Sequence, residues 1–123
     1  MSELKNLFEP VDFSKSPEEF SEILFNNNNK LDEFLPQVRL LKQGGMRIER
    51  IVSQGHVSPE DFWYDQDEGE WVAVLQGEAE LEFKDYKIKL NSGDYIFIKP
   101  HELHRVIYTS SQPQCVWLAV FIK

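Results

Sequence analysis

The sequence predicts a mainly β protein of one domain, a barrel or sandwich of antiparallel strands with a short helical segment before it. A length of 123 residues fits one domain and leaves no room for a second. From residue 38 onward, about eight short strand-like runs follow one another with turn signals roughly every 8–12 residues, the spacing of such folds. We therefore expect an N-terminal helical segment over residues 1–37 and a β-barrel over residues 38–123.

The predicted helix begins at residues 16–19, Ser-Pro-Glu-Glu. The serine can cap the helix, the proline suits its first position, and the second glutamate completes a capping box. The next apolar residues fall at positions i, i+3 and i+4 and form one stripe: Phe20, Ile23 and Leu24. The helix should end in the asparagine run 26–29, which we interpret as a loop. Residues 31–35 can add a helical turn.

The strand pattern is clearest after Gly77. Ala79, Leu81 and Phe83 alternate with three glutamates, residues 84–86 form a turn, and residues 87–90 return with two lysines. This pattern predicts an antiparallel hairpin with glutamates facing lysines on the solvent side. The other predicted strands are 46–52, 71–75, 95–98, 104–109 and 115–122. The last of these is a continuous apolar run, typical of a central strand buried on both faces.

The net charge, the cysteine count and the lengths of the apolar runs exclude several classes of protein. The 13 lysines and arginines against 21 aspartates and glutamates give a net charge of −8, which argues against binding to nucleic acid or to an anionic membrane. The single cysteine, Cys115, excludes an internal disulfide and a zinc-finger ligand set, and we expect a buried, inert thiol. The N-terminus lacks a signal-peptide pattern and no apolar run approaches about 20 residues, so we expect a soluble, cytoplasmic protein.

Two stretches carry the candidate chemistry. In the first, Glu70 is followed by six residues and Gly77. In the second, Gly93-Asp94 precedes an apolar strand, a turn with Pro100, and His104. Together and in this order, they resemble the two motifs of the cupin superfamily over residues 46–121. The chain looks most like small single-domain cupins of unassigned activity that carry Phe-Trp-Tyr-Asp-Gln before the motif glutamate. The resemblance implies a jelly-roll barrel with a pocket inside.

The chain departs from the cupin pattern where metal ligands are expected. The resemblance implies three histidines and one glutamate as ligands, and only Glu70 and His104 match that set. The His-x-His pair is absent and its place falls on residues 63–66, while His101 replaces the usual glycine of the second motif and Lys99 the usual proline. The resemblance thus implies a degenerate site for one divalent metal. Mixed oxygen and nitrogen ligands suit Mn, Fe, Ni or Zn without choosing among them.

The third ligand depends on the register of a predicted hairpin. A three-residue loop at 67–69 with Gly69 in the left-handed region would place Gln66 opposite Glu70 and Tyr64 opposite Val72, on one face. A four-residue loop would instead select Trp63 and Asp65, because a one-residue slip reverses the face. The first register is favoured and the second stays open. We therefore predict Gln66, Glu70 and His104 as metal ligands, and a pocket lined by Tyr64, Asp65, His56, His101 and Trp63.

Several of these side chains also have simpler interpretations. His56 follows Gly55 near the pocket mouth, but it is also an ordinary loop histidine. His101 lies in a turn, where an exposed side chain is expected. Trp63 can stack on a ligand or simply pack in the core.

The leading functional hypothesis is a small-molecule-binding cupin with a degenerate divalent-metal site. The resemblance implies oxygenase or isomerase chemistry, with the metal acting as a Lewis acid on an oxygen-containing substrate. The alternatives are a metal-free ligand-binding module and a structural or interaction module without catalysis. A homodimer is expected in each case, because cupins commonly pair.

Overall fold

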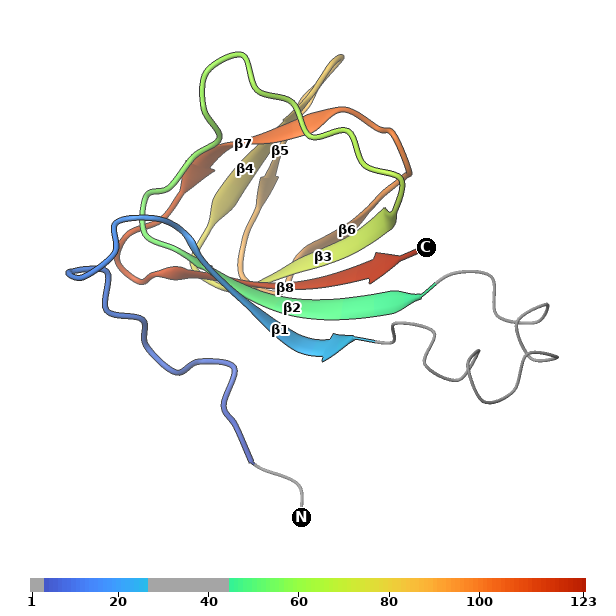
Figure 1. Cartoon of the computed structure of the whole chain (residues 1–123). Coiled ribbons are helices and arrows are strands. Elements are labelled where there is room, and N and C mark those ends of the chain that lie inside the picture. The colour runs from blue at the N-terminus through green and yellow to red at the C-terminus, as the bar shows by residue number, and fades with distance from the viewer. Residues whose placement is uncertain (1–3, 27–44) are drawn as a thin grey trace, which may run out of the picture.

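The computed structural model describes residues 4–26 and 45–123, which form two antiparallel sheets that face each other (Figure 1). The five-stranded sheet has the order β1-β2-β8-β3-β6 and the three-stranded sheet the order β5-β4-β7. The strands are β1 (Phe20–Asn26), β2 (Met46–Ser53), β3 (Gly69–Gln76), β4 (Ala79–Phe83), β5 (Lys87–Leu90), β6 (Tyr95–Ile98), β7 (His104–Thr109) and β8 (Cys115–Ile122). The mainly β, antiparallel fold class is confirmed. No helix of the described residues is long and apolar enough to span a membrane.

The hydrophobic core lies between the two sheets. Strand β8 occupies the centre of the larger sheet, paired with β2 on one side and β3 on the other, as its continuous apolar run predicts. Its inward residues pack against apolar side chains of the smaller sheet. The most deeply buried members of this core are Val72, Val74, Ala79, Leu81, Leu90, Ile98, Cys115 and Ala119.

The predicted hairpin after Gly77 is confirmed. Strand β4 pairs with β5 in the register Ala79–Leu90 and Leu81–Ile88, and the three inward residues of β4 are almost fully buried: Ala79, Leu81 and Phe83. Glu80 and Glu82 lie directly opposite Lys89 and Lys87. Gly77, which joins β3 to β4, has a φ of 82° and its backbone lies against Ser110 and Cys115, so any side chain there would clash.

The predicted N-terminal helix is wrong over the described residues, because Phe20–Asn26 forms strand β1. Short helices are marginal on their own, whereas β2 offers an open edge whose backbone groups β1 satisfies by antiparallel pairing. The apolar spacing of Phe20, Ile23 and Leu24 therefore does not mark a helical face. The predicted asparagine loop covers 26–29, but Asn26 is the last residue of β1; residues 27–29, the helical turn at 31–35 and the domain boundary at 37/38 lie outside the described residues.

Arg50 on β2 fixes the segment that precedes β1. This arginine is buried, and its guanidinium donates to the backbone oxygens of Leu7 (3.2 Å) and Glu9 (2.7 Å). It also pairs with Glu22 at 3.3 Å and lies over the ring of Phe20. A buried arginine with this many acceptors ties residues 7–22 to the sheet.

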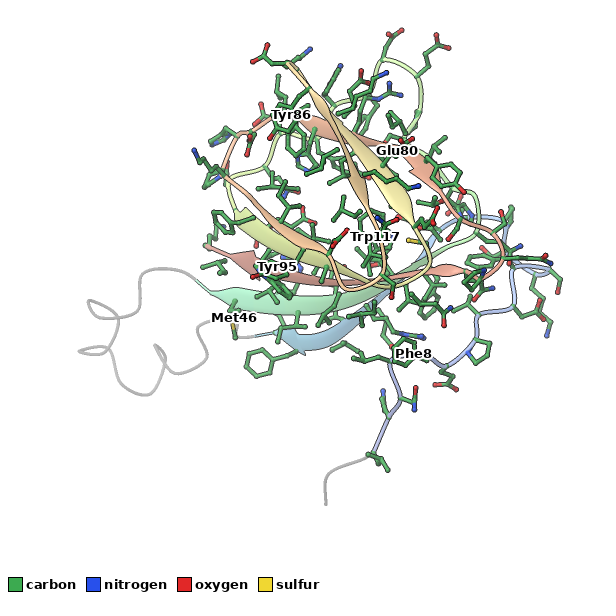
Figure 2. The ribbon with its side chains drawn as sticks, turned by 180° about the vertical axis from the view of Figure 1, so that it is seen from behind. Phe8, Met46, Glu80, Tyr86, Tyr95 and Trp117 are labelled. Atoms are coloured by element: carbon green, nitrogen blue, oxygen red, sulfur yellow. The ribbon has the colours of Figure 1, made fainter. Side chains whose placement is uncertain are left out.

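The outer face of the five-stranded sheet is apolar along a complete row of directly paired residues. Phe25 pairs with Ile48, Ile48 with Val120, Val120 with Trp71, and Trp71 with Phe97. Residues directly opposite one another point to the same face, so this row crosses all five strands. Phe25 and Phe97 are exposed, as are Met46, Tyr95 and Ile122 on neighbouring rows. In Figure 2, Met46 and Tyr95 lie along this sheet, away from Tyr86 and Glu80 on the smaller one.

Candidate functional site

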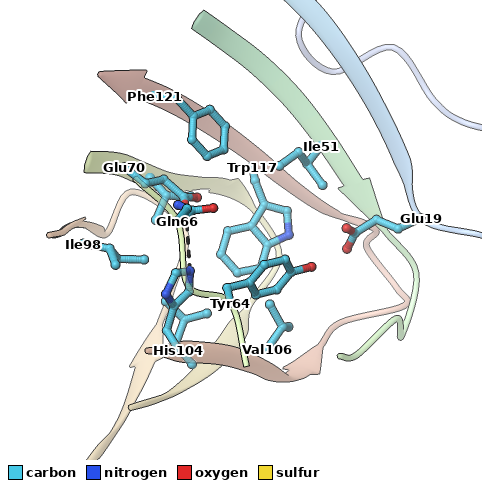
Figure 3. A pocket seen from close by; sticks show the side chains of 12 residues that line it. Glu19, Ile51, Tyr64, Gln66, Glu70, Ile98, His104, Val106, Trp117 and Phe121 are labelled. Atoms are coloured by element: carbon cyan, nitrogen blue, oxygen red, sulfur yellow. Dashed lines mark hydrogen bonds and ion pairs between the residues drawn. The ribbon is translucent and has the colours of Figure 1, made fainter. Parts of the chain in front are cut away.

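A cavity of about 110 Å³ opens between the two sheets. Most of its wall is apolar and comes from inward residues of both sheets: Ile51, Val72, Leu81, Ile98, Val106, Trp117 and Phe121. Five polar side chains complete the lining: Glu19, Tyr64, Gln66, Glu70 and His104 (Figure 3). One water molecule occupies roughly 10–15 Å³ of such a space, so the cavity suits a ligand on the order of ten non-hydrogen atoms.

Gln66, Glu70 and His104 converge on one end of this cavity. The Nε2 of Gln66 donates to Oε1 of Glu70 at 3.0 Å, and Nε2 of His104 lies 3.6 Å from the same oxygen. Glu70 stands at the start of β3 and His104 at the start of β7, so the two facing sheets bring them together. The structure thus assembles the three side chains that the sequence singles out as metal ligands.

The imidazole of His104 is oriented by a hydrogen bond at Nδ1. Its Nδ1 donates to the backbone oxygen of Glu102 at 2.8 Å, which turns Nε2 toward Glu70 and the cavity. Burial by itself would lower the pKa of His104, but the hydrogen bonds to Glu70 and Glu102 and the charges of these residues outweigh it. The net pKa of His104 is therefore raised above its usual value of 6.5.

Tyr64 forms the side of the cavity next to His104. Its backbone exchanges hydrogen bonds with that of His104 (2.8 and 3.3 Å), and its ring stacks on the imidazole with centroids 5.4 Å apart. In Figure 3 its hydroxyl points toward the side where Glu19 lies, away from Glu70. Burial, and then the charges of Glu19 and Glu70, raise the pKa of the Tyr64 hydroxyl.

The hairpin used to predict this arrangement is wrong, although Tyr64, Gln66 and Glu70 do line the same cavity. Gly69 is not among the glycines with positive φ and instead begins β3, so the predicted left-handed turn is absent there. Tyr64 pairs with His104 of β7, not with Val72, and the backbone oxygen of Gln66 accepts from His101. Residues 64–66 thus run beside the start of β7, joined to it by an isolated bridge at Tyr64. Alternation along this extended segment turns Tyr64 and Gln66 inward.

Asp65 and Trp63, the residues selected by the alternative register, lie outside the cavity lining. Asp65 is exposed and contacts Nδ1 of His101 at 2.7 Å, while Asp67 lies 3.3 Å from its Nε2. His101 is also exposed and has a left-handed φ of 63°, and its two carboxylate partners raise its pKa. Trp63 is covered instead by the ammonium of Lys84, 4.1 Å from the ring centroid.

His56 lines an outer hollow next to the cavity. This hollow, of about 240 Å³, shares Glu19, Tyr64 and Val106 with the inner cavity. The Nδ1 of His56 accepts from the backbone of Gln54 at 2.8 Å, and its Nε2 lies 2.5 Å from the backbone oxygen of Pro17. His56 therefore donates to Pro17 from Nε2 and holds residues 17–19 beside the cavity mouth.

Among the polar side chains in the described lining of the cavity, Glu19 is the one that the sequence does not single out as a site residue. Its Oε2 accepts from the buried hydroxyl of Ser53 at 2.5 Å, and Ser53 Oγ in turn accepts from Nε1 of Trp117 at 3.3 Å. From the sequence, Glu19 is predicted to be part of a capping box at the start of a helix. Its position depends on the pairing of β1 with β2, for which no local pattern gives a signal.

The Cupin domain family model matches residues 49–121 of this chain. The chain belongs to the cupin family. No curated protein matches it, but solved structures do. A Ralstonia eutropha JMP134 protein, provisionally assigned as a mannose-6-phosphate isomerase, is 31% identical with a TM-score of 0.78, and the alignment covers 99% of each chain.

More distant cupin structures share the fold. A cupin superfamily protein from Desulfitobacterium hafniense DCB-2 is 18% identical, with a TM-score of 0.62 and 98% of each chain covered. The KdgF protein from a Halomonas species is also 18% identical, with a TM-score of 0.53 over 63% of this chain and 68% of its own. These two similarities extend to the fold alone.

His104 and Glu70 are spaced almost as two ligands of one divalent metal would be. Ligand atoms that share a metal at about 2.1 Å lie roughly 3–3.4 Å apart, and Nε2 of His104 lies 3.6 Å from Oε1 of Glu70. Gln66 turns its Nε2 toward Glu70, so its amide would have to rotate to present Oε1 as a ligand. The hydrogen bond from Nδ1 of His104 to Glu102 is also the support that metal-binding histidines usually have. In the described part of the chain, no three His, Cys, Asp or Glu side chains are grouped to hold a metal, so Gln66 would have to complete the set.

Proposed function

We propose that this cupin binds a small molecule in the inner cavity, with a divalent metal held by Gln66, Glu70 and His104. One observation supports the proposal: Gln66, Glu70 and His104, whose side chain types can ligate a metal, converge at one end of a mostly apolar cavity. Pockets with apolar walls and a few convergent polar groups are the usual form of small-molecule sites.

Each residue would have a distinct part. His104, oriented by the carbonyl of Glu102, would present Nε2, and Glu70 would supply negative charge. Gln66 would supply its neutral oxygen Oε1 once its amide, whose Nε2 now faces Glu70, has rotated. The bound metal would supply Lewis acidity to an oxygen atom of the ligand. The apolar wall around Trp117 and Phe121 excludes water and receives the body of the ligand. Oxygenase or isomerase chemistry is what the cupin family suggests for such a site.

A phosphosugar is not the substrate that we propose, despite the provisional assignment of the Ralstonia eutropha protein. Phosphate is normally bound by arginine, lysine or a series of backbone amides. None of the described residues that line the cavity is a lysine or arginine, and two of the polar ones, Glu19 and Glu70, are acidic.

A metal-free binding cupin is the second candidate function. It is favoured by the hydrogen bond from Gln66 and the contact of His104, 3.6 Å away, at one oxygen of Glu70, because a proton on His104 is enough to balance that carboxylate. In that case Gln66, Glu70, His104 and Tyr64 would hydrogen-bond the polar end of the ligand directly.

Metal content separates the two candidates. The chain should be purified without a chelator or a histidine tag, and its metal measured by mass spectrometry. We expect close to one divalent ion per chain, its loss in His104→Ala and Glu70→Gln, and its retention in His101→Gly, a control outside the cavity. Circular dichroism should show that the variants fold. Metal-free protein that also fails to bind Mn²⁺, Fe²⁺, Ni²⁺ or Zn²⁺ in titration calorimetry would exclude the metal site and leave the second candidate.

We also propose a homodimer and a cytoplasmic location. The homodimer is supported by the apolar row from Phe25 to Phe97, which leaves large apolar side chains exposed on a single chain. Sedimentation of Trp71→Lys against the wild-type chain tests it, and a monomeric wild type would contradict it.

A further inference from the structure

We propose that the ligand of the inner cavity carries a protonated amine, which Glu19 receives at the cavity mouth. This inference rests on the proposed function, because it concerns the same cavity, and it adds the chemical class of the ligand. It concerns the end of the cavity opposite to Gln66, Glu70 and His104, and it holds whether or not a metal occupies that site.

The position of Glu19 is the first argument. The residue lines both the inner cavity and the outer hollow, so it stands where the two meet. Figure 3 shows its carboxylate across the cavity from His104, with Tyr64 and Trp117 between them. A ligand that reaches Glu70 from the outer hollow passes this carboxylate.

Glu19 is also held in place for such a role. Its Oε2 accepts from Ser53, whose side chain is fully buried, and Ser53 is fixed in turn by the indole of Trp117. Pro17, two residues earlier, is held by His56. No described residue forms a hydrogen bond with the second oxygen, Oε1, of Glu19. A carboxylate fixed through one oxygen can accept from a ligand through the other.

The rest of the lining suits an organic cation with an apolar body. Aromatic rings from Tyr64 and Trp117 lie beside Glu19, and aromatic faces attract ammonium groups. The ring of Phe121 already carries the guanidinium of Arg47, 4.3 Å from its centroid. Glu70 is balanced at the other end of the cavity by a proton on His104 or by a metal, whereas no lysine or arginine among the described lining residues offsets Glu19. An anionic ligand would be repelled at the mouth, whereas an ammonium group would meet a carboxylate and aromatic faces.

Three probes of matched shape test the inference: benzylammonium, benzyl alcohol and benzoate. Their dissociation constants should be measured by NMR titration of the full chain as purified, near neutral pH and at low salt. We expect benzylammonium to bind about two- to fivefold more tightly than benzyl alcohol, the size expected for a partly exposed ion pair. Benzoate should bind more weakly than the alcohol, and added salt should reduce the preference for the amine.

The variant Glu19→Gln should remove the preference for benzylammonium and leave the affinity for benzyl alcohol unchanged. Glu60→Gln is the matched control, because it makes the same charge change at an exposed position outside the cavity and should keep the preference. Equal loss of amine binding in both variants would overturn the inference in favour of a long-range charge effect.

The remaining outcomes separate this inference from the proposed function. Binding of benzyl alcohol without a preference for the amine would refute the role of Glu19 and leave the small-molecule cavity standing. Failure of all three probes to bind would refute the amine inference, while the metal measurement at His104 and Glu70 would still decide the metal site independently.

Discussion

The Nε2 of His104 lies 3.6 Å from Oε1 of Glu70, and its Nδ1 donates to the backbone oxygen of Glu102 at 2.8 Å. With Nδ1 protonated, a neutral imidazole would direct the lone pair of Nε2 at a carboxylate, which is repulsive. A positive species between the two atoms removes the repulsion. That species is either a proton on His104 or a divalent metal, so the two compete for the same place.

This competition predicts how metal affinity depends on pH. Metal binding requires neutral His104, and the pKa of His104 is raised above its usual 6.5 by Glu70 and Glu102 against the effect of burial. Metal affinity should therefore begin to fall at a pH above 6.5 as the solution is acidified. Calorimetric titration with Zn²⁺ at several pH values, in buffers of different ionisation enthalpy, should show proton release. Affinity that stays constant down to pH 6 would contradict this.

Stability without metal should have the opposite dependence on pH. Because the folded pKa of His104 exceeds its unfolded value near 6.5, the pair with Glu70 stabilises the fold fully below about pH 6.5. That contribution is lost as the pH rises through the folded pKa. The difference in unfolding free energy between wild type and His104→Gln, measured by urea denaturation with chelator, should shrink from pH 6 to pH 9. In a Glu70→Gln background the dependence should largely disappear.

Leu81→Ala should destabilise the fold by about 2–5 kcal/mol, because Leu81 is 2% exposed and lies between the sheets. Leu4→Ala makes the same change at a residue that is 97% exposed and should alter stability by less than about 0.5 kcal/mol. Urea denaturation of both variants checks the contrast. Equal stabilities would mean that β4 does not face the core.

Arg50→Met should loosen the N-terminal segment before it affects the barrel. The change removes the hydrogen bonds to Leu7 and Glu9 and the ion pair with Glu22, and should cost about 1–3 kcal/mol. Hydrogen exchange should rise first in residues 4–26. Exchange that rises equally in β4 and β7 would show that Arg50 supports the whole fold instead.

Cys115 should not react with thiol reagents in the folded protein. Its side chain is fully buried, and burial, followed by the charge of Glu19, raises its pKa to about 12. At pH 8 almost no thiolate is present, and the thiolate is the reactive form. Ellman's reagent should give no colour until urea is added. A rapid reaction in buffer alone would place Cys115 on an accessible surface.

Strands could be predicted from the sequence where the residues that alternate as apolar along the chain are also the ones that the folded sheet buries. In Ala79–Phe83 the apolar residues occupy every second position, and the sheet buries that same face. Residues 20–26 are different, since their seven residues fit a helical stripe and a strand almost equally well. The edge of β2 decides between them, and a local window does not contain that information.

Some residues of the candidate site could likewise be predicted from the sequence and others could not. The cupin motifs identify Glu70 and His104, which the facing sheets bring together. Gln66 joins them for a reason other than the predicted one, since its segment runs beside the start of β7 and not against β3. Glu19 could not be predicted, because its place depends on residues 34 and 98 positions further along the chain, Ser53 and Trp117.

Residues that alternate along the same strands of the larger sheet form two surfaces, the wall of the cavity and the outer apolar face. On β3, Glu70 and Val72 face the cavity, while Trp71 between them belongs to the outer apolar row; on β8, Phe121 faces inward and Val120 outward. Inserting or deleting one residue within either strand would exchange the ligand wall with the outer surface. Changes of ligand in related proteins should therefore arise through substitutions at inward positions, or through loops of varied length such as residues 54–68. A library designed to alter binding should keep the lengths of β3 and β8 fixed.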